Sequence, residues 1–167
     1  MAVKEVLLLG NPFLREEAEE VEEFSENLEK IITDLRDTLV HLQEKHNIGR
    51  ALAAPQIGYS QRVIYYNQGG EELVLVNPRI IENSSEKFSI WDSCFSFDVA
   101  FFVRVSRHRK IKVKFKDEKG KDKILEFEDD LAELFQHEID HLEGILATDY
   151  LEDQKDIIMR KEWEKIK

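Results

Sequence analysis

The stretch that decides the fold of this chain is DDLAELFQHEIDHL, residues 129–142. Its first turn is acidic, which suits the positive end of a helix dipole, and Gly144 lies just beyond its last turn, where helices commonly stop. We therefore predict a helix from about Asp129 to Leu142. The second half of this helix carries the pattern His-Glu-x-x-His, which makes it the first candidate for the chemistry of the chain.

Two histidines and a glutamate on this helix form a metal-binding pattern. His137 and His141 are one turn apart on the same helical face, so both imidazoles can bind one divalent metal ion. Glu138 can then serve as the general base of a metal-assisted hydrolysis. The alternative is a surface helix with two ordinary histidines, because a match to a five-residue pattern is not rare.

A third metal ligand has to come from elsewhere, because a catalytic site of this kind uses three protein ligands and one open position. No histidine or cysteine follows His141, Glu143 is too near, and Glu152 has no supporting pattern. Upstream the chain has a single cysteine, Cys94, which would complete a site of two nitrogens and one sulfur. The alternative for a lone cysteine is a buried thiol in the core.

A third segment, Gly49-Arg50-Ala51-Leu52-Ala53-Ala54-Pro55-Gln56, is a run of small residues that ends in an amide. Small residues allow a ligand to approach the backbone closely, and Gln56 can donate a hydrogen bond to a developing oxyanion. The alternative is a loop in which alanine serves only for packing. Taken alone, this segment favours the packing interpretation.

The rest of the chain predicts an α+β fold with mostly antiparallel sheet, in a single domain over residues 1–167. Apolar residues at spacings of three and four predict a helix from Glu26 to about Lys45, with Ser25 as its N-cap. A terminal helix is expected from about Asp153 to Ile166. Strands are predicted at Arg62–Tyr66, Leu73–Val76, Lys110–Lys116 and Ile124–Phe127, with a hairpin at Gly69-Gly70 and a strand end at Pro78.

Composition narrows the classes of function. The chain has 167 residues and a formal net charge of −11, which makes it a poor candidate for tracking the phosphate backbone of DNA. It has no apolar run of about 18 residues, so no membrane span is expected. One cysteine excludes an intramolecular disulfide. We therefore expect a cytoplasmic protein without a DNA or membrane partner.

In their order and spacing, the three segments resemble the peptide deformylase family. The family pattern is a Gly-x-Gly-x-Ala-Ala-x-Gln loop, a Glu-Gly-Cys-x-Ser strand end and a His-Glu-x-x-His helix, which correspond here to Gly49–Gln56, Asp92–Ser96 and His137–His141. Asn11–Arg15 and Asp140–Gly144 are also similar to the family. The resemblance implies a small α+β domain in which antiparallel sheets wrap around the metal-binding helix.

The resemblance also implies an activity, which is removal of the N-formyl group from the initiator methionine of nascent polypeptides. Glu138 would take a proton from the attacking water and pass it to the leaving amine. Gln56 and the backbone N–H of Phe95 would hold the oxyanion. The implied metal ligands are Cys94, His137 and His141, with Fe²⁺ as the usual ion of the family and Zn²⁺, Ni²⁺ or Co²⁺ as replacements.

The sequence departs from the family motifs at several positions. Ala51 replaces the second glycine of the loop, Asp92 and Ser93 replace Glu-Gly, and Phe95 replaces a leucine. None of these changes removes a metal ligand, the base or the oxyanion amide, so the chemistry is expected to survive. Asp92 is expected to pair with Arg107, and the alternative is that Arg107 is simply solvated.

The residues that correspond to the pocket for the first side chain of the substrate differ more strongly from the family pattern. The implied substrate-binding residues are Gly49, Arg50, Ala51, Glu133 and Leu134. Arg50 stands where the family is usually aliphatic, and Glu133 and Asp130 stand where apolar residues line the pocket. One resolution is an Arg50–Glu133 ion pair that reshapes the pocket, and another is a different, polar substrate. We hypothesise a divergent amidohydrolase with weak activity on formyl-methionine peptides.

Three other interpretations stay open at this point. In the first interpretation, the chain is a deformylase-like protein that keeps the fold and the metal. It then binds or acts on a different N-acyl amide, or it is catalytically weak. In the second interpretation, the chain is a His-Glu-x-x-His peptidase that cleaves internal peptide bonds, although the upstream cysteine argues against this. The basic cluster Arg104–Lys110 is a solvated strand edge or a transient ribosome contact. Trp91 is expected in the core, and His41, His46 and His108 at the surface.

Overall fold

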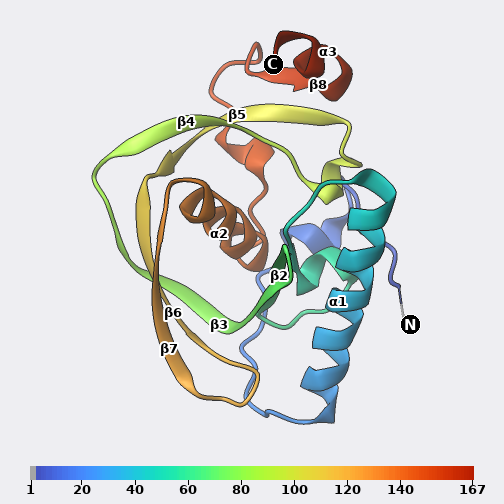
Figure 1. The fold of residues 1–167 in the computed structure, drawn as a ribbon, viewed down its shortest axis with the longest axis vertical. Helices are drawn as coiled ribbons and strands as arrows, with labels where there is room; N and C mark the ends of the chain where they lie inside the picture. Colours follow the sequence, from blue (N-terminus) through green and yellow to red (C-terminus); the bar gives the residue numbers. More distant parts are fainter. Residues whose placement is uncertain (1–2) are drawn as a thin grey trace.

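A computed structural model describes residues 3–167 and shows an α+β fold built on two antiparallel sheets (Figure 1). The strands of the larger sheet lie in the order β1-β2-β3-β6-β7, and those of the smaller sheet in the order β4-β5-β8. No helix within residues 3–167 is both long enough and apolar enough to cross a membrane. The helices are α1 (Glu26–His46), α2 (Asp129–Leu142) and α3 (Arg160–Ile166), and the strands are β1 (Ala51–Ala53), β2 (Val63–Gln68), β3 (Glu71–Asn83), β4 (Lys87–Asp92), β5 (Phe101–His108), β6 (Lys110–Lys116), β7 (Asp122–Glu128) and β8 (Ile157–Met159).

Helix α2 lies in the middle of the molecule, with strands of both sheets around it (Figure 1). One side of the helix packs into the main core, where Phe135 and Ile139 meet Ile64, Leu75 and Val113 of the larger sheet. The predicted bounds of this helix are confirmed, and so is the expectation that antiparallel sheets wrap around it. Burial of almost the whole helix brings its polar residues into the interior as well, which prepares a site there.

Helix α1 covers the opposite face of the larger sheet. Side chains alternate between the two faces of a strand, so Ile64 and Tyr66 of β2 pack toward α2, whereas Val63 and Tyr65 pack toward α1. The predicted helix is confirmed to within one residue at its end, and Asn47 stops it in the left-handed conformation. Ser25 occupies the N-cap position, but its side chain makes no capping hydrogen bond.

Two predicted boundaries are wrong. Strand β3 does not end at Pro78 but runs on to Asn83, because a register shift between Val76 and Arg79 absorbs the proline. A bulge of this kind tolerates a residue without an N–H group. The terminal helix does not begin at Asp153 but at Arg160, because the preceding Ile157–Met159 pairs with the edge of β5 as β8.

Candidate active site

The structure brings the three predicted metal ligands together. His137 and His141 extend from α2, and Cys94 follows β4 as the N-cap of a short 3₁₀ helix, Phe95–Phe97. The Cys94 Sγ lies 3.3 Å from Nε2 of His141, and this nitrogen lies 3.2 Å from Nε2 of His137. All three side chains are buried. Cys94 precedes His137 by 43 residues in the sequence, yet the fold places its sulfur beside the imidazoles of His137 and His141.

These donor atoms fit a divalent metal ion. The ligand atoms of the three residues all lie within 4.8 Å of one another. Metal–ligand bonds of about 2.0–2.3 Å in a tetrahedral arrangement place ligand atoms about 3.3–3.7 Å apart, close to the distances seen here. In addition, Nδ1 of His141 and Oε2 of Glu138 are buried without a hydrogen-bond partner among the described residues. The donor set of one sulfur and two nitrogens suits Fe²⁺, Zn²⁺, Ni²⁺ and Co²⁺ alike.

A buried network of charged side chains orients His137. Its Nδ1 donates to Oδ2 of Asp92 at 2.9 Å, and Arg107 donates to the same oxygen at 3.2 Å. Arg107 also donates to Asp140 at 2.5 Å, and the hydroxyl of Tyr150 donates to the other oxygen of Asp140 at 3.0 Å. The predicted Asp92–Arg107 pair is confirmed, and the solvated alternative is wrong because the Arg107 side chain is 3% exposed.

The pKa values of the two histidines are shifted in opposite directions. Burial by itself lowers the pKa of His137, but the charges of Asp92 and Cys94 and their hydrogen bonds raise it well above its ordinary value. Burial, and then the nearby His137, hold the pKa of His141 well below its ordinary value. These opposite shifts favour the neutral form of His141 and the protonated form of His137, and a metal ion binds an imidazole only through an unprotonated nitrogen.

Glu138 lies beside the candidate ligands and is 4% exposed. Burial raises the pKa of its carboxyl to about 7. A group with a pKa near the working pH can both accept and donate a proton, which is the requirement for a general acid–base catalyst. The side chain also lines the cavity described below, so a substrate in that cavity is within its reach.

Gln56 is held in place by its neighbours. Its Oε1 accepts from the backbone N–H of Ala53 at 3.0 Å, and its Nε2 donates to Cys94 Sγ at 3.3 Å and to Ser96 Oγ at 3.2 Å. The backbone N–H of Phe95, at the start of the 3₁₀ helix, donates to no acceptor within residues 3–167. Both hydrogens of the Gln56 Nε2 are thus engaged, with Cys94 and Ser96, whereas the N–H of Phe95 is free in the described part of the chain, and the two donor groups flank Cys94.

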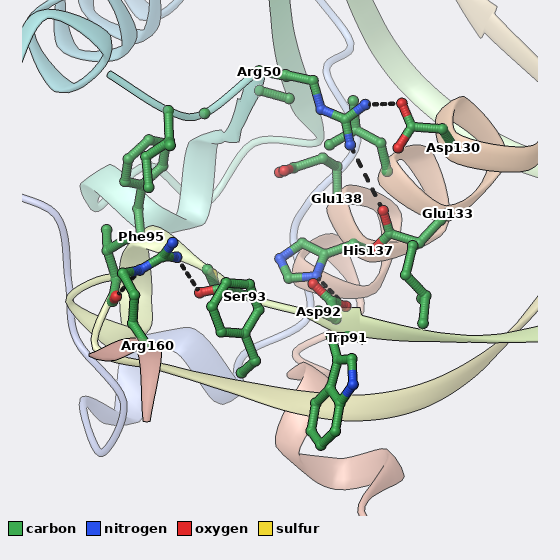
Figure 2. Close-up of a pocket in the computed structure, with 18 of the residues that line it drawn as sticks. Arg50, Trp91, Asp92, Ser93, Phe95, Asp130, Glu133, His137, Glu138 and Arg160 are labelled. Atoms are coloured by element: carbon green, nitrogen blue, oxygen red, sulfur yellow. Dashed lines mark hydrogen bonds and ion pairs between the residues drawn. The ribbon is translucent and has the colours of Figure 1, made fainter. Parts of the chain in front are cut away.

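A cavity of about 350 Å³ opens above these residues (Figure 2). The residues expected to bind substrate, namely Gly49, Arg50, Ala51, Glu133 and Leu134, all line it. Trp91 lines it too, so the expectation that Trp91 belongs to the core is wrong. Phe102 of β5 forms another part of the cavity wall.

One end of the cavity is charged. Arg50 extends from the loop before β1 toward α2, where it forms a close hydrogen-bonded ion pair with Asp130 and a second ion pair with Glu133, at 3.8 Å (Figure 2). The predicted Arg50–Glu133 pair is thus confirmed. Burial, and then the charge of Asp92, raise the pKa of Glu133 to about 7. The ion pairs connect the two walls of the cavity near His137.

Sequence reasoning missed the contribution of the C-terminal segment. Arg160, Trp163 and Lys167 line the same cavity, and Trp163 stacks on Phe102 with ring centroids 4.4 Å apart. Arg160 donates to the carbonyl of Val99 at 2.5 Å and to Ser93 Oγ at 3.2 Å. No motif marks these residues, and only the pairing of β8 with β5 brings them to the cavity.

The basic cluster on β5 and β6 is largely engaged with acidic side chains. Arg109 pairs with Glu86 and Asp129, and Lys110 pairs with Glu128. Arg107 is buried, as described above, and Arg104 lies 3.6 Å from an oxygen of Asp156. The cluster therefore does not present a row of free cations, which weakens the case for a ribosome contact at this strand edge.

A family model and curated relatives that match this chain are all deformylases. The family model described as polypeptide deformylase matches residues 3–156. The chain is 43% identical to the peptide deformylase of Heliobacterium modesticaldum over 152 residues, which cover 91% of this chain and 96% of the relative. It is 36% identical to the peptide deformylase of Thermotoga maritima over 156 residues, covering 93% and 92% of the two chains.

Solved structures agree with these relatives. A crystal structure of a peptide deformylase from Legionella pneumophila matches with a TM-score of 0.84 and 36% identity, over 93% of this chain and 89% of that chain. The peptide deformylase structure from Thermotoga maritima matches with a TM-score of 0.84 and 35% identity, over 92% and 100%. The chain therefore belongs to the peptide deformylase family, the metal-dependent hydrolases that remove the N-formyl group from nascent peptides.

Proposed function

We propose that this chain performs deformylation with Cys94, His137 and His141 as metal ligands and Glu138 as the proton carrier. The observation that carries the proposal is the convergence of one sulfur and two imidazole nitrogens beside a buried carboxyl, at the floor of a cavity. Three residues of suitable type meet at distances that suit a metal ion.

The metal ion we propose is Fe²⁺, the usual ion of the family, with Zn²⁺, Ni²⁺ and Co²⁺ as functional replacements. When held by Cys94, His137 and His141, a divalent ion would supply Lewis acidity, which would polarise a carbonyl group and lower the pKa of water. The donor set does not choose among these ions, because thiolate and imidazole bind all of them.

The residues of the chain have distinct roles in the reaction we propose. Water adds to the formyl carbon while Glu138 takes one of its protons. The backbone N–H of Phe95 and the Nε2 of Gln56 donate hydrogen bonds to the carbonyl oxygen as negative charge develops on it. The carbon–nitrogen bond then breaks, Glu138 passes its proton to the departing nitrogen, and formate and a free amino terminus are the products.

The cavity walls bind the peptide in this proposal. Gly49, Arg50 and Ala51 form one wall, and Glu133 and Leu134 of α2 form the facing wall. Gly49 lets the ring of Phe95 pack closely against this wall, because a Cβ atom added there would lie 2.1 Å from that ring. The partner is an N-formylated nascent peptide, and its first side chain enters between the two walls.

The proposal extends to the organisation and place of action of the protein. We infer that the chain is a single domain, because within residues 3–167 strands of both sheets contact α2. Nascent peptides emerge in the cytoplasm, so the protein acts there. A transient ribosome contact stays a prediction, and a salt-dependent cosedimentation with ribosomes would test it.

The experiment is formate release from formyl-Met-Ala-Ser by anaerobically purified protein, combined with metal analysis. Cys94→Ala and His141→Ala should lose both metal and activity, while Glu138→Ala should keep the metal and lose activity. His41→Ala and Glu126→Ala, at exposed positions, are the matched controls and should keep both. Metal-loaded wild-type protein that releases no formate from any formyl peptide would refute the proposal.

A further inference from the structure

The charged end of the cavity contains more carboxylates than cations. Arg50 is shared by Asp130 and Glu133, and Arg107, behind the same wall, is shared by Asp92 and Asp140. Asp92 is satisfied by His137 and Arg107, and Asp130 holds Arg50 by a close hydrogen bond on the exposed side. The unbalanced negative charge therefore resides at Glu133.

Glu133 has the weakest partner of the group. Its side chain is 8% exposed, yet its one ion-pair partner among the described residues, Arg50, is 3.8 Å away, too far for a direct hydrogen bond. A carboxylate oxygen of Glu133 also lies within 4.8 Å of ligand atoms of both Asp92 and His137. A nearly buried carboxylate without a donor is costly, so this group favours any occupant that brings a hydrogen-bond donor.

A methionine side chain cannot bring a hydrogen-bond donor to Glu133. Its thioether is a weak acceptor, and placing it against Glu133 removes water from the carboxylate without replacing the lost hydrogen bonds. An ammonium or amide group at the end of a side chain of similar length would donate to Glu133 and, for the ammonium, balance its charge. Arg50 does not compete for this position, because Asp130 retains it at the rim of the cavity.

On the basis of the proposed deformylation, we infer that Glu133, with Arg50 and Asp130, makes this enzyme select N-formyl peptides whose first side chain ends in a hydrogen-bond donor. A lysine-like ammonium is the best occupant and a glutamine-like amide the next. An apolar side chain of equal length is disfavoured because it leaves Glu133 without a donor. Glu133 is thus the specificity-determining residue of the site, and it takes no part in the proton transfers.

The test compares formyl-Xaa-Ala-Ser peptides that differ in one group, using the anaerobically purified holoenzyme. Lysine is norleucine plus an amino group, and glutamine resembles methionine in length, so these form two matched pairs. We expect kcat/KM for the lysine peptide to exceed that for the norleucine peptide by at least about tenfold, and glutamine to exceed methionine. A glutamate peptide, which has the wrong charge, should be the poorest substrate.

Variants and a binding measurement separate recognition from chemistry. In Glu133→Gln, the lysine-to-norleucine ratio should fall to about one, and in Arg50→Leu/Glu133→Ile it should invert. Lys112→Ala/Glu82→Ala removes an ion pair that lies on β3 and β6 and lines no part of the cavity, and should leave the ratio unchanged. Calorimetry with the Glu138→Gln holoenzyme should give a lower dissociation constant for the formyl-lysine peptide than for the formyl-norleucine peptide.

Each outcome tests either the preference for a donor-bearing side chain or deformylation itself. Norleucine and methionine peptides that react as fast as lysine and glutamine peptides would overturn the inference and leave deformylation intact. A glutamate peptide as good as the lysine peptide would also overturn it, since Arg50 would then be the recognising group. Holoenzyme that releases formate from none of the peptides would refute deformylation itself. Because the wild-type comparison needs no variant, poor folding of a mutant does not affect it.

Discussion

Nδ1 of His137 and Oδ2 of Asp92 lie 2.9 Å apart, so a buried hydrogen bond joins α2 to the end of β4. A carboxylate accepts and does not donate, so Nδ1 carries the proton and Nε2 faces His141 and Cys94. The residue that precedes Cys94 by two positions thus orients the histidine that lies across from it.

Asp92→Asn should weaken metal binding by about 10- to 100-fold. The amide keeps the size of the side chain but loses the charge that orients His137 and stabilises Arg107. Competition with a chelator, followed by elemental analysis, measures the effect. Asp122→Asn, which removes an exposed carboxylate from β7, is the control and should retain metal as the wild type does. Equal metal retention in both variants would show that Asp92 does not support the metal site.

Gly49→Ala should destabilise the protein by about 1–3 kcal/mol, measured as the free energy of unfolding in urea. Backbone strain and a steric clash both contribute, because Gly49 has a φ of +102° and a Cβ there would lie 2.1 Å from the Phe95 ring. Gly10→Ala is a close control, since Gly10 has a φ of +103° but no heavy atom within 4 Å of the added Cβ. The difference between the two variants measures the contact with Phe95, and equal losses would mean that the ring moves away freely.

The free energy of unfolding of the metal-free protein should fall as the pH rises from about 4.5 to about 7. Burial, followed by the charge of Asp92, raises the pKa of Glu133 to about 7 from its ordinary value of 4.5, so the folded state holds a proton that the unfolded state releases. The stabilising contribution is complete below the unfolded pKa and is lost as the pH passes through the folded one.

Glu133→Gln should flatten this pH dependence by at most about 3 kcal/mol between pH 4.5 and 7, since one pKa unit corresponds to about 1.4 kcal/mol. Urea titrations across this range give the comparison. The exposed Glu126→Gln is the matched control and should follow the wild-type curve. If Glu133→Gln follows that curve as well, Glu133 ionises in the folded state much as it does in the unfolded chain.

Arg160→Ala should lower kcat/KM for a formyl peptide by roughly ten- to a hundredfold through loss of positioning. Arg160 holds Ser93 and the carbonyl of Val99, which lie on either side of Cys94 and Phe95 in the chain, and Val99 itself has a φ of +55° that is unfavourable for a β-branched residue. The substitution should also speed hydrogen exchange of the backbone N–H groups of residues 93–99.

Arg160→Lys should restore part of the activity, because an ammonium can keep one of the two hydrogen bonds. Lys161→Ala, at the exposed neighbouring position, should change neither the kinetics nor the exchange rates. Loss of activity in Arg160→Ala without any change in exchange would mean that Arg160 acts on the substrate directly and does not brace the segment that contains Cys94.

The sequence by itself determined the features that depend on neighbours in the chain. Helix α2 has the predicted bounds because its capping signals are local, and the spacing of His137 and His141 places both on one face in any α-helix. The charges at Arg50 and Glu133 were visible as departures from an apolar pattern, and their ion pair followed from opposite charge on facing walls. The order of the three motifs was enough to indicate the family.

Only the tertiary structure decided the features that depend on distant segments. The approach of Cys94 to His141 requires β4 to pack beside α2, and no local signal encodes that distance. Residues 157–159 became a strand because β5 offered an unpaired edge, and this pairing outweighed the helical periodicity expected from Asp153. As a result, Arg160 and Trp163 entered the cavity wall. Long-range pairing is set by the packing of the whole chain, and a single sequence read locally does not contain it.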